Sequence, residues 1–210
     1  GIIGVFLNTL DKLITSTMLN MQATALLGLG ARFPSMALSI PSSMSAVFLP
    51  ATAYMHSQQR HQEMTDMYLH GSRLIGLATG FLMGFLAAFS APLIVAWLGN
   101  QTEYQIAAII MTIYTLPQHL HVLTGPGSAF FKGIDNPGNN LIYSFSRLGL
   151  TLVCVIIGLK VFGITIITIA TTLAVATTIS ALIYLASNNH RIGISQWTFF
   201  TKATLPGLIP

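Results

Sequence analysis

Residues 148–186 read LGLTLVCVIIGLKVFGITIITIATTLAVATTISALIYLA and contain one charged side chain, Lys160. The apolar windows around this stretch cover about 140–159 and 164–186 and are separated by the short segment KVFG. Each window is close to the ~20 residues that an α-helix needs to cross the hydrocarbon core of a bilayer. The stretch therefore predicts two membrane-spanning helices joined by a tight connection.

The rest of the chain is similarly apolar and poor in charged residues. Of its 210 residues, 7% are charged and 53% are hydrophobic, whereas about 25% of the residues of a soluble domain are charged. No segment shows the alternating pattern of an outer-membrane barrel strand. We therefore expect an all-α fold, a polytopic membrane bundle of six helices with the start of a seventh, over about 1–19, 23–53, 69–98, 104–131, 140–159 and 164–186.

The domain organisation follows from these windows. Residues 1–194 are expected to form one transmembrane lobe, and 195–210 the start of a further, truncated span. Because the chain opens on Gly1 and stops within the apolar stretch LPGLIP, we expect it to be a piece of a longer protein. The single cysteine, Cys154, excludes an intrachain disulfide and is expected to face lipid or to pack.

The positive charges predict an orientation. Arg60 with Arg73, then Lys132, then Arg191 with Lys202 fall in or near alternate loops, which the positive-inside rule places in the cytoplasm. The first span then runs outward. The net charge of +4 is small and gives no indication of a nucleic-acid partner.

Two spans contain helix-breaking residues. The second carries prolines 34, 41 and 50, and its roughly 30 residues exceed the length needed to cross the membrane, so it must tilt, kink or protrude. The fourth carries LPQHLHVLTGPGSAF, which predicts a similar break. His119 and His121 in that stretch are two residues apart and should face different directions. Either is interpreted as a packing residue or, alternatively, as a proton carrier.

Four charges are predicted inside the membrane: Asp11, Lys12, Arg32 and Arg147. A charge at the bilayer centre costs about 2.5 to 3.5 kcal/mol on insertion scales, so such residues usually meet a partner or a wet cavity. One hypothesis is a structural Asp11–Arg32 ion pair, with Lys12 and Arg147 snorkelling toward an interface. The other is a water-filled cavity with excess positive charge, suited to a phosphate or diphosphate.

The hairpin LNTLDKLITSTMLNMQATALLGLGARF, followed by PSSMSAVFLPATAYMHSQ, resembles two consecutive helices of polysaccharide (O-antigen, Wzx-type) flippases in the multidrug/oligosaccharidyl-lipid/polysaccharide exporter superfamily. Asp11, Lys12, Arg32 and Pro50 match the positions of that pattern, and FKGIDNPGNNLIYSFSRLGL is similar to a later loop. The resemblance implies the C-terminal lobe of a two-lobe transporter in the bacterial inner membrane, whose partners are membrane lipids and the N-terminal lobe of the same protein.

The same resemblance implies that an undecaprenyl-diphosphate-linked oligosaccharide crosses the membrane for surface polysaccharide biosynthesis. Lys12, Arg32 and Arg147 would then bind the diphosphate, and Asp11 would be a charge partner or would couple ions. The alternatives are a cation-coupled multidrug exporter, a lipid II flippase or a non-transporting membrane scaffold. We expect no enzyme, cofactor or metal site, because the sequence offers neither a nucleophile with a base nor a metal-ligand spacing.

Overall fold

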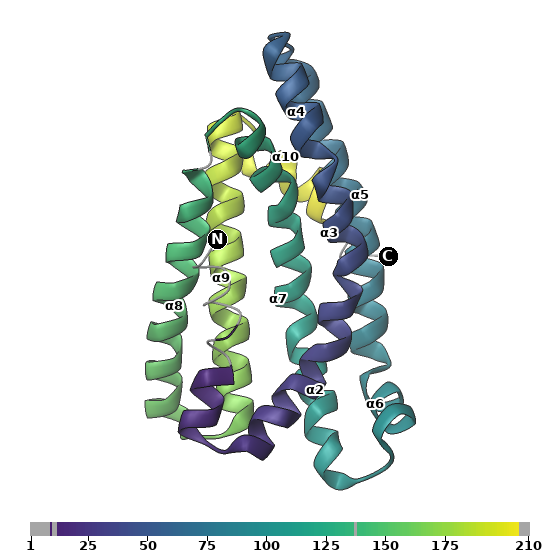
Figure 1. Ribbon diagram of the computed structural model, residues 1–210, viewed down its shortest axis with the longest axis vertical. Helices are drawn as coiled ribbons and strands as arrows, with labels where there is room; N and C mark the ends of the chain where they lie inside the picture. The colour runs from purple at the N-terminus through teal and green to yellow at the C-terminus, as the bar shows by residue number, and fades with distance from the viewer. Residues whose placement is uncertain (1–8, 10–11, 137, 206–210) are drawn as a thin grey trace.

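A computed structural model describes residues 9, 12–136 and 138–205. The described part of the chain is helical, with no strand, which confirms the all-α prediction. Helical residues 12–18 precede the labelled helices. These are α2 (Met21–Ala37), α3 (Ser39–Ala46), α4 (Phe48–Ser57), α5 (His61–Ala88), α6 (Ser90–Leu98), α7 (Thr102–Gly133), α8 (Asn139–Phe162), α9 (Ile166–Ile192), α10 (Gln196–Phe199) and the π-helix η1 (Phe200–Thr204) (Figure 1).

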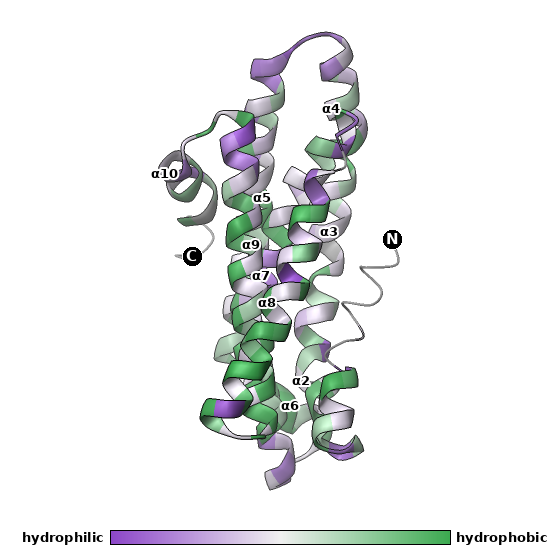
Figure 2. Cartoon of the chain, turned by 90° about the vertical axis from the view of Figure 1, so that its left-hand side faces the viewer, coloured by the Kyte–Doolittle hydropathy of each residue, from purple (hydrophilic) through white to green (hydrophobic). Residues whose placement is uncertain are grey.

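Four of these helices, α5, α7, α8 and α9, are long and apolar enough to cross a membrane. The count becomes five if the bent pair Met21–Ala37 and Pro41–Ser57 is one span. The transmembrane character expected from the sequence is thus supported, while the first expected span, about 1–19, falls only partly within the described residues. Hydrophilic residues gather at the two ends of the bundle, most clearly at the α4–α5 tip (Figure 2).

The second expected span is three helices bent by 51° overall. Proline removes the N–H that would bond the carbonyl four residues earlier. For Pro41 that carbonyl belongs to Ala37, the last residue of α2, and for Pro50 it belongs to Ala46, the last residue of α3. The two breaks therefore fall where the prolines release a backbone acceptor, and the predicted kink is confirmed.

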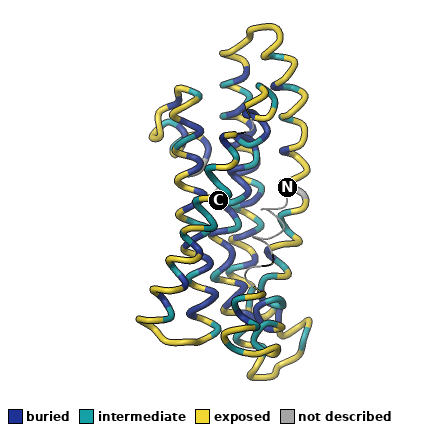
Figure 3. Tube along the Cα trace, turned by 60° about the vertical axis from the view of Figure 1, so that its left-hand side comes forward, coloured by how far each residue is buried: buried dark blue, intermediate teal, exposed yellow. Residues whose placement is uncertain are grey.

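The break expected in the fourth span is wrong, because α7 runs through Pro117 and Pro126 without interruption. This helix lies at the centre of the bundle and packs against α2, α4, α5, α6 and α9. Neighbouring helices on most of its sides support the helical path despite the lost backbone bonds. Buried residues accordingly run along the middle of the bundle, while exposed ones cover its tips and outer faces (Figure 3).

Other predicted boundaries need correction. The loop expected before residue 69 is helical from His61, where Glu63 in the first turn pairs with Arg60 at 3.4 Å and suits the positive end of the helix dipole. The third expected span divides at Phe89 into α5 and α6. The last long helix continues past 186 to Ile192 and ends on the left-handed Gly193. Polar residues concealed the first and last of these boundaries, whereas the division at Phe89 falls where Pro92 releases the carbonyl of Ala88.

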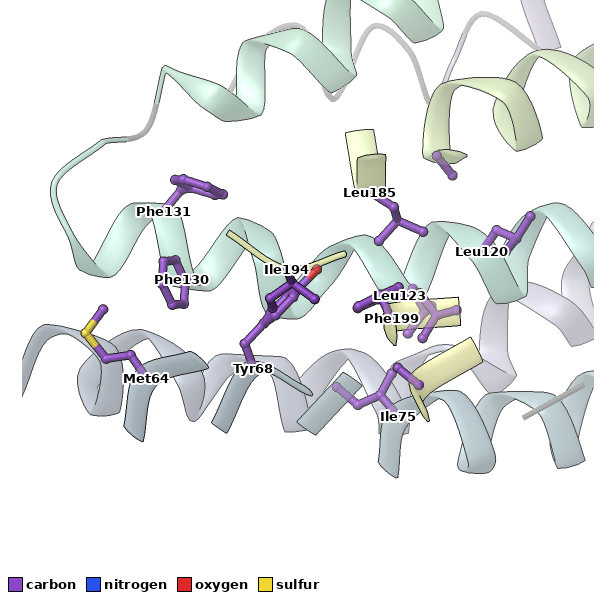
Figure 4. Packing of buried hydrophobic residues seen from close by; sticks show 13 residues of the cluster. Met64, Tyr68, Ile75, Leu120, Leu123, Phe130, Phe131, Leu185, Ile194 and Phe199 are labelled. Atoms are coloured by element: carbon purple, nitrogen blue, oxygen red, sulfur yellow. The ribbon is translucent and has the colours of Figure 1, made fainter. Parts of the chain in front are cut away.

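The largest buried apolar cluster joins α5, α7, α9 and α10. Tyr68 stacks on Phe199 with ring centroids 5.5 Å apart, and Leu123 and Ile75 are fully buried beside them (Figure 4). At the same end of the bundle lie the α4–α5 and α7–α8 connections and the end of α9 (Figure 1). The elements that carry Arg60, Lys132 and Arg191 thus share one end, as the charge pattern predicts.

Candidate functional site: a polar groove between α3, α7 and α8

A cavity of about 490 Å³ lies between the helices, and we call it the polar groove. Its floor is α7, one wall is α3 with the start of α4, and the other wall is α8 with Tyr184 of α9 (Figure 1). Its polar lining consists of Ser42, Ser45, His121, Thr124, Ser128, Lys132, Asn140, Tyr143, Ser144 and Tyr184. A cavity with this lining is unusual among helices that are otherwise apolar enough to cross a membrane.

Each of three helices turns a polar stripe toward the groove. On α7 the stripe consists of His121, Thr124, Ser128 and Lys132. On α3 it consists of Ser42 and Ser45, and on α8 of Asn140, Tyr143 and Ser144. Residues at such intervals of three and four share one helix face. The groove is therefore encoded by helical spacing, a signal present in the sequence that reasoning from charges alone missed.

Aromatic rings form part of the α8 side of the groove. His121 and Tyr143 stack with centroids 5.5 Å apart, and His121 Nδ1 lies 2.6 Å from the Tyr143 hydroxyl. The Tyr184 ring lies 5.5 Å from that of Tyr143, and its hydroxyl donates to Asn140 Oδ1. The groove thus combines flat ring surfaces with hydroxyl, amide and imidazole groups, as sites for polyhydroxylated ligands do.

Small residues of α7 let α3 pack closely against the floor of the groove. Thr124 Oγ1 donates to the His121 carbonyl at 2.6 Å, so its hydroxyl is partly satisfied within the helix. Gly125 lets α3 approach so closely that an added Cβ would lie 2.6 Å from Ser45 Oγ. The wall formed by α3 is therefore held tightly against the floor.

Buried asparagines link the helices behind the groove lining. Asn139 Nδ2 donates to Asn188 Oδ1, and both residues are buried. Tyr68 donates to Asn189 Oδ1 at 3.0 Å, which ties α9 to α5. Asn188 and Asn189 were expected in a loop; in the structure they belong to α9, where buried amides need hydrogen-bond partners and so fix the register of the packed helices.

The charges expected in the membrane separate into two groups. Arg147 is part-buried one turn beyond Tyr143, and its guanidinium is close enough to interact with the Tyr143 hydroxyl and with His121. Lys12 and Arg32 are exposed, and neither lines the polar groove. Asp11 lies outside the described residues. None of these three cations lines the groove, but Arg147 lies beside two of its lining residues, and a binding role for all three stays a prediction.

Lys132 is the cation in the groove lining. The sequence placed it in a loop, but it lies in the last turn of α7. Within the described chain the groove lining contains no carboxylate. With Arg147 at its edge, the groove therefore has a positive electrostatic bias.

The two histidines of α7 do face different directions, as expected. His119 is buried on the opposite side of the helix from the groove, with Nδ1 2.8 Å from Thr79 Oγ1 on α5. Thr79 Oγ1 also lies 2.7 Å from the Ile75 carbonyl, to which it donates. His119 thus packs against α5 through one hydrogen bond, and its role as a packing residue or a proton carrier stays a prediction, while His121 belongs to the groove.

Comparisons with models of protein families, with curated proteins and with solved structures gave no match. A functional assignment therefore depends on the groove itself. Among the residues that the structure describes, no group of three or more histidine, cysteine or acidic side chains could hold a metal ion.

Proposed function

We propose that the chain is part of a membrane transporter whose polar groove binds the head of an anionic, lipid-linked oligosaccharide while the lipid remains in the bilayer. The observation that carries the proposal is a groove of about 490 Å³ with a polar, cationic lining between helices of membrane-spanning character. Polar cavities are costly in a membrane bundle and usually mark a substrate pathway. A flippase of the kind that the sequence resembles requires such a polar cavity for the head group of its substrate.

The groove has side chains suited to both parts of such a head group, the phosphates and the sugars. Lys132 inside the groove and Arg147 at its edge would bind phosphate oxygens through charge-assisted hydrogen bonds. The stacked His121 and Tyr143 rings, with the nearby hydroxyl and amide groups, would accept a sugar. The rival, a cation-coupled exporter, requires intramembrane carboxylates, and the described lining provides none.

The proposal is tested by obstructing the groove. Ser42 is an exposed residue of the α3 wall, so Ser42→Trp would fill the groove without disturbing a buried contact. Met44→Trp, on the same helix but on another face and outside the groove lining, is the matched control. In cells that depend on this protein, we expect Ser42→Trp to abolish surface polysaccharide and Met44→Trp to preserve it. Normal polysaccharide with Ser42→Trp would overturn the proposal.

A further inference from the structure

A second cavity, of about 230 Å³, lies at the end of the bundle that carries Arg60 and Lys132, away from the polar groove; we call it the interfacial pocket. Three basic side chains from three helices line it: His56 in the last turn of α4, His61 at the start of α5 and Arg191 in the last turn of α9. All three are exposed, and the two imidazole rings lie 6.3 Å apart. Residues distant in sequence thus gather hydrogen-bond donors around one opening.

The floor of the pocket is apolar. Met64, Phe130 and Phe131 are 2%, 7% and 3% exposed and belong to the main buried cluster (Figure 4). A fully hydrated anion would gain nothing from such a floor. The combination of a basic rim and an aromatic floor instead fits a ligand with a charged head and an adjoining apolar part.

The position of the pocket matches the level of lipid headgroups. Two of its sides are the ends of membrane-spanning candidates, α7 at Gly133 and α9 at Ile192. His56 and His61 belong to the hydrophilic α4–α5 tip (Figure 2). Basic pockets between transmembrane helices at this level bind anionic lipid headgroups.

The surrounding acidic groups leave the basic rim available. Glu63 pairs with Arg60, Asp66 accepts from Gln62 at 3.3 Å, and Asp135 follows the lining residue Ile134; none of these three acidic residues lines the pocket. Arg191 forms no ion pair with any described residue. Stabilising the end of α9 through the helix dipole would account for Arg191 alone, but not for His56 and His61 converging on the same opening.

We propose that the interfacial pocket binds the phosphate of an anionic phospholipid, with the glycerol and first acyl carbons against Phe130 and Phe131. The phosphate would accept hydrogen bonds from Arg191 and the two imidazoles. The same donors would accept a free phosphate ion, so the shared chemistry is a phosphate group and the apolar floor selects the lipid. This site is separate from the proposed transport function and does not depend on it.

The test measures lipid retention. The protein, purified in detergent and delipidated, is exposed to mixed micelles of phosphatidylglycerol and phosphatidylcholine, and bound lipid is quantified by mass spectrometry. We expect the wild-type protein to prefer phosphatidylglycerol. This preference should fall at least several-fold in Arg191→Gln and in the double variant His56→Gln/His61→Gln, and Arg191→Lys should retain part of it. Lys160→Gln, in the last turn of α8 at the opposite end of the bundle, should keep the wild-type preference.

Three results would overturn the proposal. The first is an unchanged lipid preference in Arg191→Gln, and the second is an equal loss in Lys160→Gln, which would show unspecific charge attraction. The third is displacement of phosphatidylglycerol by equimolar inorganic phosphate, which would show that the pocket takes the free ion. Melting temperatures of all variants, measured in the same detergent, separate loss of the site from loss of folding.

Discussion

The rings of His121 of α7 and Tyr143 of α8 stack nearly parallel with centroids 5.5 Å apart, and Nδ1 and the hydroxyl share a hydrogen bond of 2.6 Å. The pair joins the floor of the polar groove to its α8 wall, although α7 and α8 otherwise make few contacts along their length. The pair is therefore one of the few direct links between the floor and the α8 wall, which packing against α9 otherwise holds in place.

Replacing Tyr143 by Phe should remove the hydrogen bond and keep the ring stack. Loss of one such bond costs about 1 kcal/mol, so we expect a modest fall in melting temperature, and a larger one for Tyr143→Ala. Thermal unfolding in detergent micelles gives the measurement. Tyr54→Phe, on a side chain that is 62% exposed, is the control and should be neutral; an equal loss in both Phe variants would contradict this role for the pair.

Two glycines of α2 should respond in opposite ways to alanine. A Cβ at Gly30 would lie 2.7 Å from the Ala107 carbonyl oxygen and from Ile110, whereas nothing lies within 4 Å of a Cβ at Gly28. Overpacking costs about 1–3 kcal/mol, and exchanging Gly for Ala in an open helical position gains up to about 1 kcal/mol. Gly30→Ala should thus lower thermal stability and Gly28→Ala preserve or raise it; equal effects would refute the close α2–α7 contact.

The orientation in the membrane can be read from cysteine labelling. In a Cys154→Ala background, Gln59→Cys in the α4–α5 turn should be labelled by a membrane-impermeant thiol reagent only after the cells are opened, because the basic end is predicted to be cytoplasmic. Asn100→Cys, in the α6–α7 connection at the other end (Figure 1), should be labelled in intact cells. The reverse pattern would show an inverted topology.

Among the three cations predicted to bind substrate, Arg147 is expected to matter most. It lies beside Tyr143 and His121, while Lys12 and Arg32 are exposed away from the groove lining. Surface polysaccharide should fall strongly with Arg147→Gln and little with Arg32→Gln. If Arg32→Gln abolished export and Arg147→Gln did not, the binding site would lie outside the polar groove.

The sequence predicts the helical class and the later spans well, because long apolar runs such as 164–186 have few other stable structures in a bilayer. It misplaces ends where polar residues continue a helix, as at His61 and Asn188, since composition does not distinguish a loop from a helix that leaves the membrane. The groove itself was missed because serines and threonines are common in membrane helices. Lys132 joins Ser128, Thr124 and His121 only when α7 continues unbroken through Pro126, and that continuity depends on tertiary support.

The polar groove is proposed to bind the anionic head of a lipid-linked oligosaccharide. The most direct measurement is the flipping of a fluorescent lipid-diphosphate oligosaccharide by the full-length protein in proteoliposomes. Losing a charge-assisted hydrogen bond of about 1.5–3 kcal/mol should weaken apparent substrate affinity roughly 10- to 100-fold in Lys132→Gln and leave Lys160→Gln unchanged. Wild-type affinity in Lys132→Gln, or an equal loss in Lys160→Gln, would contradict the proposal.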